Sequence, residues 1–238
     1  MNVLLLGSEC FNGDTAVITN AGQILHIKTV LKAKIGDVLK IGQLGGHLGI
    51  GVLAKLSDFQ AVFTNVVLDK SPPAKLGVTL MLALPRPKVL RRLIIDMTAI
   101  GVDHIILINS VRTDKSYWGS PLLGRLDEFI IEGLQQGVDT MAPKITLAKR
   151  FKPFVQDSLP ALITPNRAVV FHPYDSQGFG EFCGKNDLPI FVAIGAEGGF
   201  VPYEIELLRS IGVVSVALGE RILRTEGVVN AVLGRYLL

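Results

Sequence analysis

A glycine-rich hexapeptide is the first feature of this sequence that could bind a ligand. Residues 195–200 read Gly-Ala-Glu-Gly-Gly-Phe and follow an apolar run of strand length, Ile190–Ile194. Three glycines let bare backbone amides and carbonyls approach a ligand closely. The loop has neither the Gly-x-x-x-x-Gly-Lys nor the Gly-x-Gly-x-x-Gly spacing of phosphate-binding loops. It therefore favours an uncharged group such as adenosine, although a tight strand-to-helix turn would use the same residues.

A second segment whose side chains could take part in chemistry lies close to the carboxyl end. Residues 218–226 read Leu-Gly-Glu-Arg-Ile-Leu-Arg-Thr-Glu, so Arg221, Arg224 and Glu226 fall within six positions. Glu226 has a simple structural explanation, because a carboxylate at a helix start complements the helix dipole. Arg224 stands in a Leu-rich stretch between two core elements, where a buried charge needs a carboxylate, a carbonyl or a ligand. We expect a ligand, with a structural ion pair as the alternative.

The elements that would position these loops alternate between strands and helices. Val78–Leu84 is a buried strand, Lys88–Ile100 carries one apolar helical face, and His104–Asn109 is a second buried strand. Such a unit predicts a parallel sheet with a right-handed crossover. The pattern continues with helices near 121–136, 203–211 and 226–237, and with strands at Ala168–Phe171, Ile190–Ile194 and Val213–Leu218.

This alternation predicts an α/β domain with both faces of its sheet covered. In an open α/β sheet a ligand lies beyond the carboxyl ends of the strands. The loops after Phe171, Ile194 and Leu218 are therefore the predicted site.

The first 70 residues have a different sequence pattern. Short runs with glycine-containing turns predict a small β-barrel or sandwich, with strands near Thr15–Thr19, Asp37–Ile41, Ile50–Leu53 and Gln60–Leu68. One helix is expected over His26–Lys32. Lys70–Lys75 contains two prolines and no periodicity. We therefore expect two domains, residues 1–70 and 75–238.

Composition excludes several classes of protein. A chain of 238 residues with 49% hydrophobic content and a net charge of +3 is not a disordered one. Cys10, Cys183 and four histidines do not support a disulfide framework or a metal site, and His26, His47 and His104 are interpreted as structural. With only two cysteines, a reducing, cytoplasmic location is expected. We see no membrane-spanning run and no signal peptide.

The two loop segments together resemble a known signature. Gly195-Ala-Glu-Gly-Gly-Phe followed by Val214-Ser-Val-Ala-Leu-Gly-Glu-Arg-Ile-Leu-Arg-Thr-Glu is similar to the closing motifs of the 16S ribosomal RNA uracil-N3 methyltransferases. These enzymes belong to the trefoil-knotted SPOUT methyltransferases. His26-Ile-x-x-Val-Leu-Lys with Ile-Gly-Asp resembles the PUA-like N-terminal barrel of that family. Lys88–Gly101 resembles its first transferase helix, and Phe171-His-Pro the loop before its knot.

The resemblance implies a homodimer whose carboxyl-terminal segment threads a loop, so that the knot forms a pocket for S-adenosylmethionine. The cofactor residues that it implies are Phe171, His172, Ile194, Gly195, Glu197, Gly198, Gly199, Leu218, Gly219, Arg221, Ile222, Leu223 and Arg224. It also implies methyl transfer to N3 of a uridine in 16S ribosomal RNA or in the small ribosomal subunit. Arg224 and Glu226 would be catalytic, with Arg224 stabilising the uracil oxygens, and the general base is left open.

Two groups of basic residues could hold RNA phosphates. Lys28, Lys32 and Lys34 lie in the first domain, and Arg86, Lys88, Arg91 and Arg92 open the second. Ordinary solvated faces would look the same. Tyr117 and Trp118 could stack on a flipped base, but edge packing is the favoured interpretation.

Several positions depart from the family pattern. Met1–Leu6 has no basic residue, Ala99-Ile-Gly replaces Glu-Leu-Gly, and Leu134–Asp139 lacks the family's Glu-Gln-x-x-Arg. Ala196 stands for a proline and Gly227 for a threonine. Two alternatives therefore stay open: a diverged paralogue that methylates another RNA, and an RNA-binding module with a decayed transferase.

Overall fold

The computed structural model describes residues 2–164, 166–175, 177–185 and 187–237. The chain divides into two compact units. The first comprises Met1–Ala74 with Ile130–Ala142, and the second comprises Lys75–Phe129 with Pro143–Leu238. No helix among the described residues is long and apolar enough to span a membrane.

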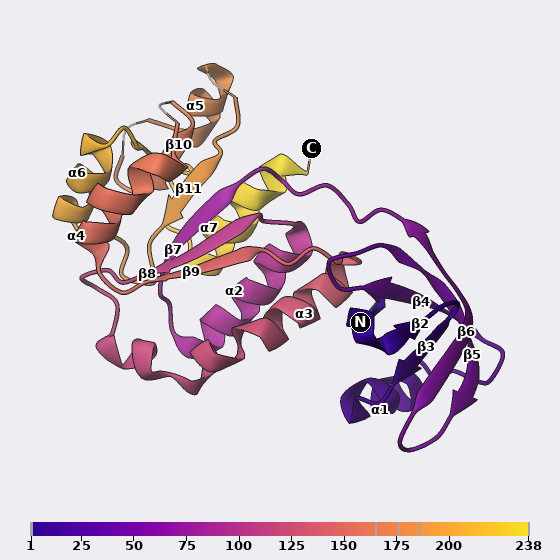
Figure 1. The fold of residues 1–238 in the computed structure, drawn as a ribbon. Coiled ribbons are helices and arrows are strands. Elements are labelled where there is room, and N and C mark those ends of the chain that lie inside the picture. The colour runs from indigo at the N-terminus through magenta and orange to yellow at the C-terminus, as the bar shows by residue number, and fades with distance from the viewer. Residues whose placement is uncertain (1, 165, 176, 186, 238) are drawn as a thin grey trace. The chain divides into compact units, whose positions relative to one another are not determined.

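The first unit is built on a six-stranded sheet in the order β1-β4-β5-β6-β3-β2 (Figure 1). Its strands are β1 (Leu4–Leu6), β2 (Phe11–Asn12), β3 (Thr15–Ile18), β4 (Val38–Gln43), β5 (Leu48–Leu56) and β6 (Ala61–Lys70). Neighbouring strands are antiparallel except β1 and β4, which are parallel. Alternate residues point inward, so Ile18, Ile41, Leu53 and Phe63 are fully buried in a shared core.

The helix of this unit, α1, spans Ala21–Thr29, so the predicted bounds of His26–Lys32 are wrong. The helix begins earlier because the Asn20 side-chain oxygen accepts a hydrogen bond from the Gln23 N–H at 3.0 Å and caps the first turn. Three residues after the last helical residue, Lys32 has a positive φ of 50°, which a continuing α-helix does not allow.

A segment distant in sequence completes the first unit. Helix α3 spans Leu126–Gly137, and residues 130–142 belong to the first unit. The backbone N–H of Asn2 donates to the carbonyl of Gln135 at 3.0 Å, and that of Gly45 donates to the carbonyl of Thr140 at 2.9 Å. The expected division of the chain at Lys70–Lys75 alone does not include residues 130–142 in the first unit.

The second unit contains a fully parallel six-stranded sheet in the order β12-β10-β11-β7-β8-β9. Its strands are β7 (Thr79–Ala83), β8 (His104–Ile108), β9 (Lys144–Ala148), β10 (Ala168–Phe171), β11 (Phe191–Ile194) and β12 (Val214–Val216). The predicted α/β class with a parallel sheet is confirmed. Strand β9 was not predicted, because its residues, Lys-Ile-Thr-Leu-Ala at the edge of the sheet, give no continuous apolar run.

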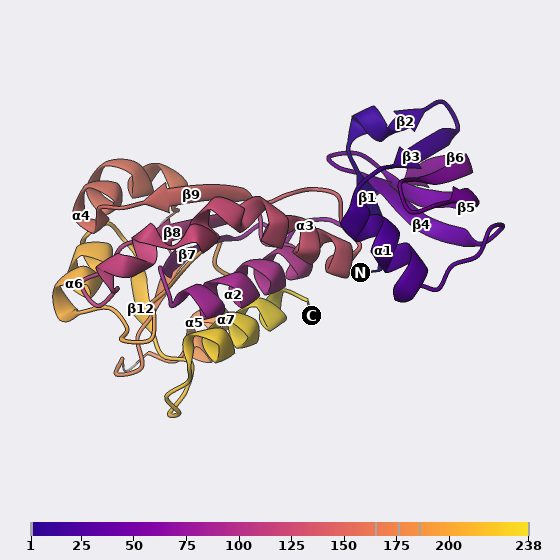
Figure 2. The ribbon, with the colours of Figure 1, turned by 90° about the horizontal axis from the view of Figure 1, so that it is seen from below.

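Helices cover both faces of this sheet. Figures 1 and 2 show α2 and α7 side by side on one face, with α4 and α6 on the other. The helices are α2 (Pro87–Ile100), α4 (Phe151–Pro153), α5 (Phe179–Lys185), α6 (Pro202–Ser210) and α7 (Thr225–Leu233). Helix α2 starts with Pro87 in its first turn and ends at Gly101, whose φ of 101° forms a left-handed cap. The predicted helix over 121–136 is a 3-10 turn, Pro121–Arg125, followed by α3.

Phe191 tests the core of the second unit. This side chain is fully buried at the start of the central strand β11. Because Phe191→Ala leaves a large cavity, it should lower the free energy of unfolding by about 3–5 kcal/mol in urea denaturation. The same substitution at Phe59, which is 85% exposed, should cost less than about 0.5 kcal/mol. Equal effects of the two variants would contradict the described packing.

His104 should make stability depend on pH. The side chain is buried and its Nε2 lies 2.8 Å from Thr146 Oγ1. Burial, assisted by the charge of Lys144, lowers the pKa of His104. The unfolded chain therefore binds the proton more readily, and stability should fall as the pH drops from about 7.5 through about 6.5 toward the lowered pKa. His104→Gln should remove this part of the loss in urea titrations. A difference between wild type and variant that stays constant with pH would contradict it.

Candidate functional site

A cavity of about 1130 Å³ opens in the second unit. It is lined by the segment after β10, the glycine loop after β11 and the segment between β12 and α7. All the residues that the sequence predicts for cofactor binding and catalysis line it: Phe171, His172, Ile194, Gly195, Glu197, Gly198, Gly199, Leu218, Gly219, Arg221, Ile222, Leu223, Arg224 and Glu226. Three loops that are distant in sequence thus share one cavity.

The glycine loop is folded tightly back on itself. A Cβ atom at Gly195 would lie 2.7 Å from the Gly199 Cα, so no larger residue fits there without movement of the backbone. The carbonyl of Gly195 accepts a hydrogen bond from the Thr225 hydroxyl at 3.3 Å, which joins this loop to the start of α7. Residues 195–199 therefore form one wall of the cavity, in which Gly195, Gly198 and Gly199 present bare backbone.

Glu197 of this loop is paired with Arg86, which directly precedes α2. The Glu197 Oε1 accepts hydrogen bonds from the Arg86 side chain at 2.9 Å and from the Arg86 backbone N–H at 3.2 Å. Burial alone would raise the pKa of the Glu197 carboxyl. The hydrogen bonds and charge of Arg86, together with a hydrogen bond from the backbone of Glu197 itself, hold that pKa below its usual value. Glu197 is therefore ionised at neutral pH.

A second ion pair crosses the cavity wall between α2 and α7. Arg92 Nη2 lies 3.0 Å from Glu226 Oε1, and the Glu226 side chain is 26% exposed. Arg86, Lys88 and Arg92, which the sequence assigned to RNA, line the same cavity as the predicted cofactor residues. Arg91 is not among the lining residues; its guanidinium carbon lies 5.5 Å from the centre of the Phe129 ring.

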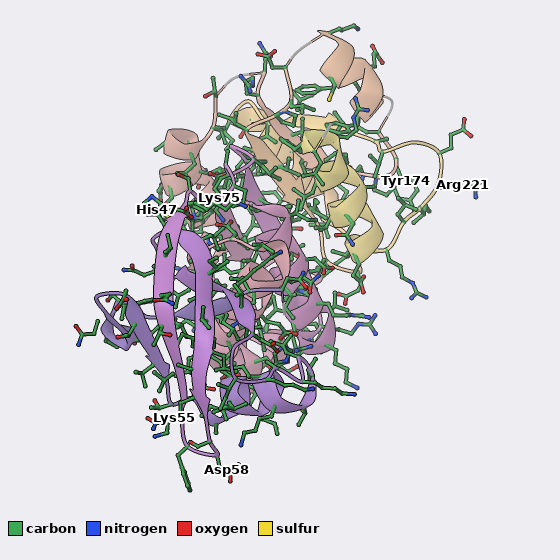
Figure 3. The ribbon with its side chains drawn as sticks, turned by 90° about the vertical axis from the view of Figure 1, so that its right-hand side faces the viewer. His47, Lys55, Asp58, Lys75, Tyr174 and Arg221 are labelled. Atoms are coloured by element: carbon green, nitrogen blue, oxygen red, sulfur yellow. The ribbon has the colours of Figure 1, made fainter. Side chains whose placement is uncertain are left out.

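Arg224 lies in surroundings that differ from the predicted ones. It was expected to be a buried charge in a Leu-rich loop, but it is exposed, and its neighbours Ile222 and Leu223 are exposed as well. Desolvation therefore does not force Arg224 to find a partner. Figure 3 shows Arg221 and Tyr174 at the outer edge of this region, and both line the cavity.

The cavity concentrates positive charge. Six basic side chains line it, Arg86, Lys88, Arg92, Arg112, Arg221 and Arg224, against two carboxylates, Glu197 and Glu226. The resulting excess of four formal positive charges exceeds the net charge of +3 of the entire chain. Such a local field attracts a polyanion whatever the charge of the rest of the molecule.

Arg112 is a lining residue that the sequence reasoning missed. The loops after Phe171, Ile194 and Leu218 were considered, but the loops after β7 and β8 leave the same parallel sheet at the same edge. Applying the rule of carboxyl-terminal strand ends to all strands would have included Arg86 after β7 and Arg112 after β8 as cavity residues.

Glu204 was also missed, and it holds two of these loops together. This carboxylate is 1% exposed, and it accepts hydrogen bonds from the Val111 N–H at 2.8 Å and from the Val201 N–H at 2.9 Å. Val111 belongs to the loop after β8, and Val201 precedes α6. The sequence signal was available, because a glutamate three residues after a helix start is typical of N-terminal capping.

The other residues that the sequence predicts to contact RNA lie partly outside the cavity. Tyr117 lines the cavity, whereas the Trp118 Nε1 donates to Asn109 Oδ1 at 2.8 Å and its ring lies 6.0 Å from the Lys149 ammonium. In the first unit, Lys32 and Lys34 are exposed, and Lys28 is paired with Asp58 at 2.5 Å. Among the described residues no group of His, Cys, Asp or Glu side chains is arranged to hold a metal ion.

Comparison with protein families gives a match over most of the chain. Residues 72–236 match a family described as "RNA methyltransferase domain". The chain is 27% identical over 231 residues to the ribosomal RNA small subunit methyltransferase E of Treponema pallidum, covering 95% of this chain and 86% of that one. It is 28% identical to the ribosomal RNA small subunit methyltransferase E 1 of Borreliella burgdorferi, with 95% and 93% covered.

Solved structures share the fold. A Neisseria gonorrhoeae ribosomal RNA small subunit methyltransferase E bound to S-adenosyl methionine superposes with a TM-score of 0.74 at 18% identity, covering 100% of this chain and 95% of that one. A Legionella pneumophila protein in complex with SAM gives a TM-score of 0.76 at 18% identity, with 99% and 96% covered. Both likenesses extend over the two units.

Glu204 offers a test of how the cavity walls are held. Glu204→Ala should leave the N–H groups of Val111 and Val201 without their acceptor, at a cost of about 1–3 kcal/mol for each buried donor. Urea denaturation would measure the loss. Glu206→Ala removes an exposed carboxylate from the same helix and should change stability by less than about 0.5 kcal/mol. A Glu204→Ala variant as stable as Glu206→Ala would contradict this role.

Proposed function

The chain belongs to the RNA methyltransferase family, and from that premise we propose that it transfers a methyl group from S-adenosylmethionine to N3 of a uridine in 16S ribosomal RNA. The observation that carries the proposal is the single cavity in which a bare glycine loop and an excess of basic side chains face the same space. The relatives named for small-subunit ribosomal RNA methylation support this substrate, since they match nearly the whole chain.

The residues present fit the proposed cofactor. Residues 195–199 offer backbone groups to an adenosine, and the close approach of Gly195 to Gly199 explains why position 195 carries no side chain. Phe171, Ile194 and Leu218 supply apolar contact surface for an uncharged ring system. When bound, S-adenosylmethionine would supply an electrophilic methyl group for a nucleophilic nitrogen.

The chain's own residues must deal with the proton on N3 of the uracil. That nitrogen becomes nucleophilic only when its proton passes to a general base, to which no residue is assigned, and negative charge then spreads onto the two carbonyl oxygens at C2 and C4. The Arg224 guanidinium is assigned to stabilise those oxygens, since it lines the cavity and no carboxylate pairs with it in the described part of the chain. Glu226 is the carboxylate of the same segment, held by Arg92 at 3.0 Å, and is assigned to the catalytic site with it.

The architecture that the family resemblance implies belongs to the same proposal. The curled sheet of the first unit would be a PUA-like barrel that holds RNA through Lys28, Lys32 and Lys34. The segment after β12 would thread a trefoil knot, and two copies of the second unit would pair as a homodimer. Backbone hydrogen bonds support this threading, because Ala217, directly after β12, donates to Gln177 and accepts from Phe179 in the segment after β10.

Methyl incorporation tests the proposal directly. Purified protein should transfer labelled methyl groups from S-adenosylmethionine to small ribosomal subunits from a strain that lacks this gene, and digestion should place the label in 3-methyluridine. Label in another RNA would favour the diverged paralogue, to which the departures at Leu134–Asp139 point. Absence of S-adenosylmethionine binding in calorimetry would favour the decayed transferase and would contradict the proposal.

Arg224→Ala tests the assigned chemistry. Because the variant loses a donor that stabilises charge in the transition state, kcat should fall by about 10²–10³-fold. The Kd for S-adenosylmethionine, measured by calorimetry, should stay within a few fold. Arg125→Ala is the matched control, since Arg125 lies on the surface, is paired with Glu128 and does not line the cavity. Unchanged turnover in Arg224→Ala would remove this residue from the mechanism.

A further inference from the structure

Arg112 is a cavity residue that the cofactor loops do not explain. It lies in the loop after β8, on a different segment from the three loops assigned to the cofactor. Its side chain is exposed to the cavity and carries a full charge. An exposed arginine normally samples many conformations, and contacts of its stem and guanidinium with neighbouring groups narrow that range.

The backbone around Arg112 is fixed on both sides. Before it, the Val111 N–H donates to the buried Glu204 carboxylate at 2.8 Å. After it, Thr113 is buried and its N–H closes a turn onto the Ser110 carbonyl at 3.1 Å. Buried groups therefore set the direction in which the Arg112 side chain leaves the loop.

The side chain is fixed as well. Its guanidinium donates a hydrogen bond to the Gly198 carbonyl. A Cβ atom at Gly198 would lie 3.0 Å from both the Cβ and the Cδ of Arg112, so the stem of the arginine rests on the bare Cα of that glycine. This hydrogen bond uses one N–H donor of the guanidinium, which has five. The others stay free for a ligand.

The charge of Arg112 is not compensated. Arg86 and Arg92 are paired with Glu197 and Glu226, whereas no carboxylate of the described residues pairs with Arg112. S-adenosylmethionine carries a sulfonium, an ammonium and a carboxylate, a net charge of one positive unit, so it does not call for further cations. A phosphodiester does, and the planar fork of an arginine can bind two of its oxygens at once.

We propose that Arg112 binds a backbone phosphate of the RNA beside the target uridine, an assignment that rests on the proposed function. Because its stem lies on Gly198 and its backbone is tied to Glu204, a phosphate held by Arg112 is held at a fixed position relative to the glycine loop. Arg112 thereby positions the nucleotide against the cofactor. It takes no part in the proton transfer.

Arg112→Ala separates this role from others. With small ribosomal subunits as substrate, KM for the subunit should rise by about 10- to 100-fold, as expected for a lost charged hydrogen bond, while KM for S-adenosylmethionine stays within a few fold. The slope of log(kcat/KM) against log of salt concentration should become shallower by about 0.7–0.9, the share of one phosphate. Arg112→Lys should restore part of the salt slope, because it keeps the charge without the fork. Arg125→Ala should match wild type.

Other outcomes overturn the inference. A salt slope equal to that of wild type would show that Arg112 meets no phosphate. A parallel loss of S-adenosylmethionine affinity in calorimetry would place Arg112 on the cofactor carboxylate or on the glycine loop alone. These results leave the proposed function intact as long as the wild-type protein methylates the subunit. Failure of wild-type methylation, in contrast, contradicts the proposed function itself. In that case the binding of a uridine-containing RNA 12-mer, followed by fluorescence anisotropy at several salt concentrations, would still decide whether Arg112→Ala changes the salt dependence of RNA affinity.

Discussion

The site depends on one constraint, the parallel direction of all six strands in the second unit. Parallel strands send their carboxyl ends to one edge, so the loops after β7, β8, β10, β11 and β12 all reach the same cavity. Buried polar groups then fix the loops to one another. Glu204 joins the loop after β8 to the start of α6, and Thr225 joins the glycine loop to α7. Both faces of the sheet are covered by helices, which keeps this edge as the place where polar chemistry can occur.

Charge is distributed unevenly between the cavity and the rest of the chain. The net charge of +3 gives little indication of a polyanion partner, because acidic residues elsewhere offset the basic ones. Around the cavity the balance is an excess of four positive charges. The two carboxylates there, Glu197 and Glu226, form ion pairs with Arg86 and Arg92, which leaves Lys88, Arg112, Arg221 and Arg224 without such partners among the described residues. An apolar and glycine-lined part suits an adenosine, and the cationic part suits RNA.

Much of this arrangement could be predicted from sequence where local pattern decides structure. Helix α2 and strand β10 were predicted to within one residue, because an uninterrupted apolar face and a β-branched run are strong local signals. Other features depend on single polar residues. Helix α1 was misplaced because the capping role of Asn20 was not recognised. The sequence predicts a buried Arg224 because Ile222 and Leu223 look like core residues, yet both are exposed. The ion pairs Arg86–Glu197 and Arg92–Glu226 join residues 111 and 134 positions apart, a separation that periodicity cannot bridge.

We propose that this cavity methylates N3 of a uridine in 16S ribosomal RNA. Mass mapping of 16S ribosomal RNA from a strain that lacks this gene would test that proposal. We expect one 3-methyluridine to be lost in this strain and to return when the wild-type gene is restored. An unchanged modification profile in the deletion strain would contradict it.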